Sequence, residues 1–458
     1  MHLLQPHSYG RTAGKLFILF LMLTLGARQG FAQYGGGGGT SGDPYLISTS
    51  AHLVTLSQTS ADWDNYFRQT ANIDLNGVVS LNPIGNQTTS FTGEYNGQNY
   101  TISNLTINQA SSDYQALFGR IDDVGSNGGV VENLVIDNFS ITGRNDVAAV
   151  VGFAWGGSEV SNITVTNSTV SGNEDTGVLV GECSGCSISN STVDANSSIA
   201  VQTTGGAGIA GKSTGTVTIS GCTFAGTVSS GSAVGGMAGE VFNNLTINNC
   251  TFSGTINGSS NAGGMIGRLN GSATCTITDC GSTGTVTTTG NEAGGMIGIA
   301  WGTAAISTSY FSGTVNANAI AGGFVGVFQS NGSGNSSITD CYATGSVNGG
   351  WSGGIIGEEK DGGATTLTRC YAAAEVTGNS ESRDVVSNGG SATVIATDCF
   401  YDSDINPLTA QSISGITGRT SAEMKDYTTF TAAGWDFVSE TTNGIANIWD
   451  ADQFSTLN

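Results

Sequence analysis

Short apolar stretches bounded by glycine recur along this chain at nearly constant spacing. The clearest copies read Gly-Gly, two apolar residues and Gly, as in 263–267 (GGMIG) and 294–298 (GGMIG). The final glycines of the clear and the looser copies are Gly119, Gly152, Gly181, Gly211, Gly239, Gly267, Gly298, Gly326 and Gly357. These eight intervals cover 357 − 119 = 238 residues, a mean of about 30 residues. A fixed period of this length predicts a repeat architecture.

Each repeat carries two further pieces that are typical of strands. One is seen at 246–250 (TINNC) and 276–280 (TITDC), and the other at 254–256 (GTI) and 284–286 (GTV). They are rich in β-branched residues and are separated by Gly, Asn, Ser and Asp. Three short strands and three turns in about 30 residues make one turn of a β-solenoid. We therefore expect an all-β fold, a single-chain parallel β-helix with its turns about 4.8 Å apart.

The Gly-Gly-apolar-apolar-Gly element resembles the GLUG motif of bacterial secreted and surface proteins. Residues 82–85 (NPIG), 91–97 (FTGEYNG) and 101–105 (TISNL) resemble the entry into such arrays, as do residues 42–47 (GDPYLI). The resemblance covers nearly all of the chain after residue 32 and implies an adhesin-like surface protein. Such arrays also accompany some large surface proteases, but this sequence shows no protease domain, so that activity is not carried over.

The first 32 residues have the layout of a secretory signal peptide. A start containing Arg11 and Lys15 precedes the apolar run 16–25 (LFILFLMLTL), and Gly30 and Ala32 supply the small residues for a cut after Ala32. The run is too short to span a bilayer as a helix, and no later segment is long and apolar enough. We expect a secreted or cell-surface protein, with a flexible Gly-rich linker at 33–42.

Both ends of a solenoid expose unpaired strand edges, so caps are expected there. Residues 50–57 (SAHLVTLS) predict a short amphipathic helix over the first turn, within an N-terminal cap and first turns at 43–110. Thr420 and Glu423 fit a capping box. With Trp435, Phe437 and Trp449 they predict a C-terminal cap at 401–458, so that the GLUG-type repeats occupy 111–400.

Composition and charge narrow the possible functions. The chain has 458 residues with 71 Gly and 4 Pro, 10% of its residues are charged, and the net charge is −22. Glycine is not present at every third position, which excludes collagen, and the acid excess argues against nucleic acid as a partner. Removal of the signal peptide takes Arg11, Lys15 and Arg28 and gives 10 − 35 = −25. His52 is then the one remaining histidine, which nearly excludes multi-histidine metal sites.

Six of the nine cysteines recur at one position of the repeat. They are Cys222, Cys250, Cys280, Cys341, Cys370 and Cys399. The longest gap, from Cys280 to Cys341, spans two turns. On the turn between them, Tyr310 is expected at the position that cysteine occupies elsewhere. We expect columns of buried free thiols, with disulfides between adjacent turns as the alternative. Cys183 and Cys186 form a CxxC without a histidine partner, which favours a local bridge or packed thiols over a redox or zinc role.

Acidic residues are numerous but scattered. Asp122 with Asp123, and Asp402 with Asp404, are the candidates for binding Ca²⁺, which takes oxygen ligands. Neither pair matches an EF-hand loop, and the alternative is an acidic surface that keeps the rod soluble. No other cofactor is expected.

The patterns HExxH, GxSxG and the P-loop are absent, so no catalytic residue is assigned. The resemblance therefore implies a non-enzymatic protein that adheres to a surface glycan or a matrix protein. The alternative is a carbohydrate-active β-helix enzyme, a lyase or hydrolase, which three acids and a base converging in a groove would favour. Ice or mineral binding would require threonines in register over several turns, and Thr-x-Thr does not keep one phase in the sequence. The oligomeric state is left open.

Overall fold

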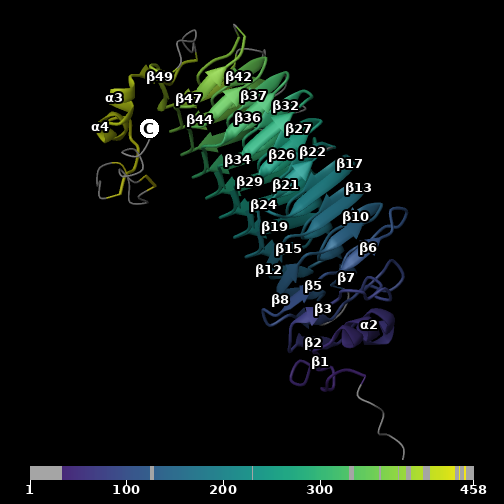
Figure 1. Ribbon diagram of the computed structural model, residues 1–458. Helices are drawn as coiled ribbons and strands as arrows, with labels where there is room; N and C mark the ends of the chain where they lie inside the picture. The colour runs from purple at the N-terminus through teal and green to yellow at the C-terminus, as the bar shows by residue number, and fades with distance from the viewer. Residues whose placement is uncertain are drawn as a thin grey trace, which may run out of the picture.

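The glycine-punctuated repeats form short strands that pair with the turns before and after them. In a computed structural model the chain is a parallel β-solenoid of about 11 turns with roughly 29 residues per turn, which confirms the predicted fold (Figure 1). The structure describes residues 33–123, 128–229, 231–329, 335–360, 363–379, 381–387, 393–405, 413–438, 443 and 448–449. The predicted signal peptide lies outside these residues. In the described part, no helix has the length and apolar character needed to cross a membrane.

One turn shows how the repeat is built. It contains β24 (Asn244–Asn248), β25 (Thr251–Phe252), β26 (Thr255–Gly258), β27 (Ser260–Gly263) and β28 (Ile266–Leu269). Five short strands are present in place of the three expected per turn. Asn249 takes a left-handed conformation between β24 and β25, and Asn261 takes one within β27. Stacking the turns gives three sheets of 24, 16 and nine strands, and the named strands pair in parallel.

Inward-facing side chains form continuous columns along the rod. Ile219, Ile247, Ile277, Ile306 and Ile338 are register partners on five successive turns of the 24-stranded sheet, and none is more than 1% exposed. Because each isoleucine removes its side chain from water and packs on its neighbours above and below, the column contributes hydrophobic stabilisation at every turn.

The final glycine of the repeated motif is required by close backbone contact. A Cβ on Gly267 would lie 2.3 Å from Val234 N, and one on Gly298 would lie 2.7 Å from Ala262 N, both on strands of the 16-stranded sheet. No side chain fits there, because the nine-stranded sheet packs directly against the backbone of the 16-stranded sheet. The motif thus marks the positions where two sheets meet.

The cysteines confirm the predicted column with one correction. The seven free cysteines are all buried, and Cys222 N and Cys250 N each lie 3.4 Å from the Sγ of the next cysteine in the column. Cys280 N instead donates to Ser309 Oγ at 3.1 Å. On the turn without a column cysteine, Ser309 therefore occupies the cysteine position. Tyr310 is one residue later and pairs with Gly281. A shift of one residue in a strand exchanges inward for outward side chains.

Thiol labelling is expected to follow this arrangement. Cys183 and Cys186 are joined in a disulfide, and the other seven cysteines are free and buried. Alkylation should therefore modify no thiol in the folded protein, seven in denaturant without reductant, and nine after reduction, as counted by intact mass. Fewer than seven modified thiols before reduction would reveal a second bridge and contradict the structure.

The N-terminal cap contains the predicted helix, α2 (Ser50–Gln58), whose Leu53 and Leu56 are fully buried. The glycine run before it differs from the expected flexible linker. Gly35 N donates to Leu46 O of β1 (Tyr45–Ile47) at 2.8 Å, and the side chain of Tyr34 is buried. Glycine supplies the positive φ of Gly37 and Gly39 in this tight segment, which explains the composition without flexibility.

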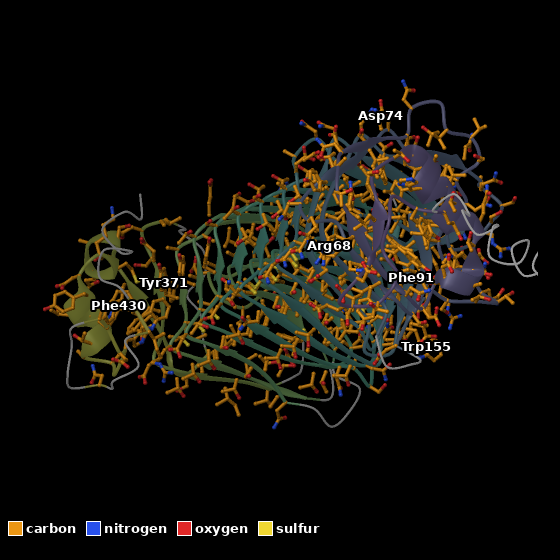
Figure 2. All side chains as sticks on the ribbon, turned by 90° about the horizontal axis from the view of Figure 1, so that it is seen from below. Arg68, Asp74, Phe91, Trp155, Tyr371 and Phe430 are labelled. Carbon is orange, nitrogen blue, oxygen red and sulfur yellow. A yellow bond between two sulfur atoms is a disulfide. The ribbon has the colours of Figure 1, made fainter. Side chains whose placement is uncertain are left out.

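The C-terminal cap packs on a ladder of aromatic rings. The predicted capping box forms at the start of α3 (Ser421–Met424), which is followed by α4 (Tyr427–Thr431). Trp435 is fully buried, with its ring centroid 4.9 Å from Phe430 and 6.2 Å from Tyr371. Figure 2 shows Tyr371 and Phe430 together at this end of the rod. The ring of Tyr371 stacks on that of Tyr342, its register partner on the preceding turn, with a centroid distance of 5.3 Å.

Glu359 is expected to make stability depend on pH. It ends β43 (Ile356–Glu359) at an inward position, in register with buried Phe328, and burial raises its pKa to about 7. Because the folded state favours the protonated acid, this contribution is present below about pH 4.5 and is lost as pH rises through 7. The melting temperature should fall over that interval, and Glu359→Gln should reduce the fall. If the melting temperature of Glu359→Gln fell with pH as much as that of the unmodified protein, this role of Glu359 would be contradicted. The same would follow if the exposed control Glu375→Gln reduced the fall equally.

Candidate functional site

The acids chosen from the sequence lie in two separate places, each beside groups that already contact them. Asp122 ends β7 (Phe118–Asp122) beside Arg120, and Asp123 is exposed. Asp402 and Asp404 hold the start of α3: Asp402 accepts from Ser421 Oγ at 2.7 Å, and Asp404 accepts from Ser421 N at 2.9 Å. Among the described residues, neither pair belongs to a group of three or more potential metal ligands.

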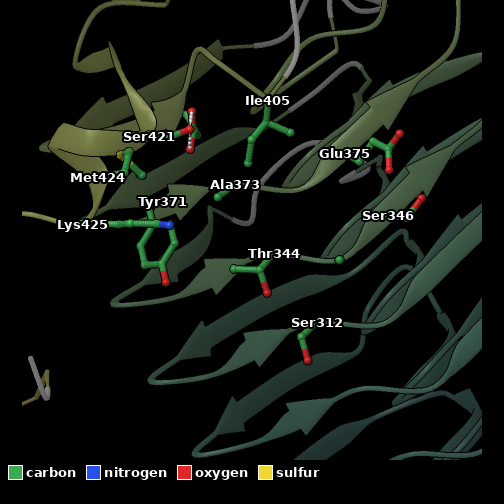
Figure 3. A pocket seen from close by; sticks show the side chains of 12 residues that line it. Ser312, Thr344, Ser346, Tyr371, Ala373, Glu375, Ile405, Ser421, Met424 and Lys425 are labelled. Carbon is green, nitrogen blue, oxygen red and sulfur yellow. Dashed lines mark hydrogen bonds between the residues drawn. The ribbon is translucent and has the colours of Figure 1, made fainter. Parts of the chain in front are cut away.

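Asp402 also lines a cavity of about 520 Å³ between the rod and the C-terminal cap (Figure 3). Tyr371 and Met424 form apolar parts of its wall, and Glu375 and Lys425 add charge. Because both carboxylate oxygens of Asp402 already accept hydrogen bonds from Ser421, this acid is committed to positioning the cap.

The outer face of the nine-stranded sheet gathers charged side chains at one register position. This charged column consists of Arg120, Glu182, Lys212, Glu240, Arg268 and Glu358, interrupted by Phe153, Ile299 and Val327. Opposite charges alternate over the four successive turns from Glu182 to Arg268, and Arg268 pairs with Glu240. The column is unusual in a chain with only 10% charged residues.

A second column on the same face carries aromatic rings. It lies two residues after the charged column, where the rings of Trp155, Phe242 and Trp301 are separated by the polar residues Ser184, Thr214 and Asn270 on the turns between them; Trp155 is 48% and Phe242 37% exposed. The three cations of the charged column lie over these rings, at 5.4 Å for Arg120 and Trp155, 5.8 Å for Lys212 and Phe242, and 5.4 Å for Arg268 and Trp301. We call the two columns together the aromatic–charged face; Trp155 is labelled in Figure 2.

Three carboxyl groups converge beside this face. They come from Asp146 on β10 (Asn145–Val147), Asp175 on β13 (Thr169–Gly177) and Glu182 on β14 (Val180–Ser184), and one oxygen from each lies within 4.8 Å of the others. Lys212 Nζ lies 3.2 Å from Asp175 Oδ2 and 3.1 Å from Glu182 Oε2. We call these three acids the acidic cluster.

Local backbone geometry brings the acidic cluster together. Asp146 and Asp175 have φ of 55° and 49°, a left-handed conformation that aspartate tolerates better than most residues. The register of β10 and β13 places them on adjacent turns. A Cβ on Gly181 would lie 2.7 Å from the carbonyl carbon of Asp146, so the final glycine of the motif lets this corner approach Glu182.

Burial and mutual repulsion separate the pKa values of the cluster. Burial, with the charges of Asp175 and Glu182, raises the pKa of Asp146 to about 8. Burial also raises the pKa of Asp175, to about 6, although Lys212 opposes the shift. Burial and like charge therefore favour the protonated form of Asp146 more than that of Asp175, an arrangement that suits proton transfer or cation binding.

Outward threonines of the 24-stranded sheet keep one phase over three successive turns only. Thr218, Thr246 and Thr276 are register partners on successive turns. The column then continues with Ala305, Ser337, Thr366 and Ile395. Because Ala305 and Ile395 interrupt it, the face does not present the uninterrupted array that ice or mineral binding would need.

Comparisons with known proteins give partial similarities. No family model matches the chain. Halomucin from Haloquadratum walsbyi is 37% identical over 127 residues, which are 25% of this chain and 1% of halomucin. A "Putative Gly-rich membrane protein" from Evansella cellulosilytica is 30% identical over 133 residues, 28% of this chain and 14% of that protein. The chain therefore matches only a small part of either relative's length.

A solved structure aligns with nearly the whole chain. It is described as a "putative immunoglobulin A1 protease" from Bacteroides ovatus and covers 90% of this chain at 17% identity with a TM-score of 0.24. A TM-score this low carries no argument about fold or function. The chain is thus a β-solenoid protein with partial similarity to halomucin and to the Gly-rich membrane protein.

The acidic cluster was missed by reasoning from sequence, although a signal was present. Asp146 and Asp175 are 175 − 146 = 29 residues apart, and Glu182 and Lys212 are 212 − 182 = 30 apart, so each pair occupies the same position on adjacent turns. Aligning acids by the repeat period, rather than searching for neighbouring acids, would have paired them.

Proposed function

We propose that this chain is an exported, non-enzymatic β-solenoid that binds a glycan along its aromatic–charged face and so mediates adhesion at a cell surface or matrix. The carrying observation is the exposed aromatic column, with Trp155 48% exposed and a cation beneath its ring. Aromatic rings offer flat apolar surfaces for the C–H face of a sugar, and the adjacent carboxylates and guanidinium groups can hydrogen-bond its hydroxyls.

Two further features support the proposal. The rings are spaced along the rod, with two turns between Trp155 and Phe242 and one turn between Phe242 and Trp301, which suits an extended ligand that contacts several turns at once. The net charge of −22 would repel a polyanion and so favours a neutral glycan. Export is supported by the layout of residues 1–32, and the assignment of the repeats to the GLUG type is supported by the contact role of their final glycines.

Glycan-array binding of the purified protein tests this proposal. Trp155→Ala should weaken binding to the preferred glycan about tenfold, corresponding to about 1.4 kcal/mol. Tyr100→Ala, which removes a 38% exposed ring outside the nine-stranded sheet, should leave binding unchanged. Equal binding by Trp155→Ala and the unmodified protein would contradict the assignment to this face.

A second candidate function is carried by the acidic cluster. Three acids converge with Lys212, which is the set of groups that a polysaccharide-cleaving enzyme would require. Asp146, whose pKa burial raises, would donate the proton in such a reaction, and Asp175 would act as its partner. Lys212 already pairs with two of the acids, which favours binding over catalysis. A turnover assay separates the two functions.

A further inference from the structure

The negative charge of the acidic cluster exceeds the positive charge of the cation that contacts it. When ionised, its three carboxylates carry −3, and Lys212 contributes +1 through contacts to Asp175 and Glu182 alone. The nearby acid Asp113 is already paired with Arg144, whose Nε lies 2.6 Å from its Oδ1. Partly buried carboxylates with this imbalance require either protons or another cation.

Asp146 supplies a separate indication of a missing ligand. The residue is 9% exposed, and its Oδ1 is a buried oxygen without a hydrogen-bond partner among the described residues. Buried polar atoms are nearly always hydrogen-bonded, so an exception at this place indicates an absent partner. The same side chain contributes a carboxylate oxygen to the cluster, so a ligand bound between the three acids would lie beside this side chain.

The dimensions of the cluster fit a calcium ion. Ca²⁺ binds carboxylate oxygens at about 2.3–2.6 Å, so oxygens on opposite sides of the ion are about 4.6–5.2 Å apart. The three oxygens lie within 4.8 Å of one another. They are also held by paired strands of two sheets rather than by loops, which keeps them in place without the ion.

We propose that Asp146, Asp175 and Glu182 form a Ca²⁺ site, in which the ion displaces the Lys212 ammonium and binds one oxygen from each acid. Lys212 can leave because its side chain is 25% exposed and its stem is flexible. Its ammonium then remains near Phe242, over which it already lies. In the absence of metal the ammonium holds Asp175 and Glu182 together, and it competes with the metal for them. The site does not depend on the proposed glycan binding.

Calorimetric titration with CaCl₂ and thermal unfolding of chelator-treated protein test the site. We expect saturable Ca²⁺ binding near one ion per chain and a rise in melting temperature of about 2–4 °C at saturating Ca²⁺. MgCl₂ should give a smaller rise, because Mg²⁺ needs shorter contacts. Asp146→Asn should lower the affinity at least tenfold, and Asp123→Asn, which removes an exposed acid outside the cluster, should not.

Lys212→Met provides the variant that separates a metal site from a purely structural ion pair. If the ammonium competes with the ion, Lys212→Met should bind Ca²⁺ at least tenfold more tightly, and Ca²⁺ should restore stability lost in chelator. The proposal is overturned if neither the unmodified protein nor Lys212→Met binds Ca²⁺, or if folded Asp146→Asn binds it as well as the unmodified protein. Loss of glycan binding with intact Ca²⁺ binding would affect the proposed function alone.

Discussion

Gly267→Ala is expected to lower the free energy of unfolding by about 3 kcal/mol, a large effect for one methyl group. The added Cβ would lie 2.3 Å from Val234 N and 2.4 Å from the carbonyl carbon of Ala233, and backbone atoms cannot move aside as a flexible side chain can. The two sheets would have to separate at this turn, and each turn is packed on its neighbours. Urea denaturation followed by circular dichroism measures the change.

Gly42→Ala is the matched control for this substitution. An added Cβ there meets no atom within 4 Å, so the free energy of unfolding should change by no more than about 0.5 kcal/mol. If Gly267→Ala were as stable as Gly42→Ala, the close packing between the nine-stranded and 16-stranded sheets would be wrong.

Trp435→Ala is expected to destabilise the C-terminal cap by about 3–5 kcal/mol. Trp435 is fully buried, packs on Phe430 and on Trp449 at 4.6 Å, and donates from Nε1 to Asp398 O at 3.0 Å. Its removal leaves a cavity and takes away a ring that holds α4 against the rod. Limited proteolysis should then cleave the cap while the solenoid stays intact.

Val438→Ala is the control, because Val438 lies in the same cap but is 46% exposed. Its cleavage rate should match that of the unmodified protein. Uniform cleavage of both variants along the whole chain would show instead that the cap and the solenoid unfold together.

The period of the motif was sufficient to predict the solenoid and the approximate turn length. Its glycines recur because backbone contacts between sheets exclude a Cβ at the same place on each turn. Thr420 and Glu423 were readable because a capping box is a local pattern. These features depend on residues close in sequence or on a strict repeat, and both are visible in a single chain.

The period pairs Asp146 with Asp175 and Glu182 with Lys212, but it does not bring these two pairs together, and it does not show that rings and charges share a face. Their positions depend on which turn aligns with which, and on the left-handed corners at Asp146 and Asp175. An error of one residue was enough to place Tyr310 where Ser309 lies. The glycine run before β1 was predicted to be a flexible linker from its composition. Composition does not distinguish such a linker from a tight segment that is hydrogen-bonded to Leu46.

The central claim is that the aromatic–charged face binds a glycan without cleaving it. The most direct measurement incubates the purified protein with the glycan that it binds best and follows both bound ligand and released products. The account predicts saturable binding that Trp155→Ala weakens, with no product formed in the presence or absence of Ca²⁺. Release of shortened or unsaturated sugars, abolished by Asp146→Asn, would contradict it and establish an enzyme instead.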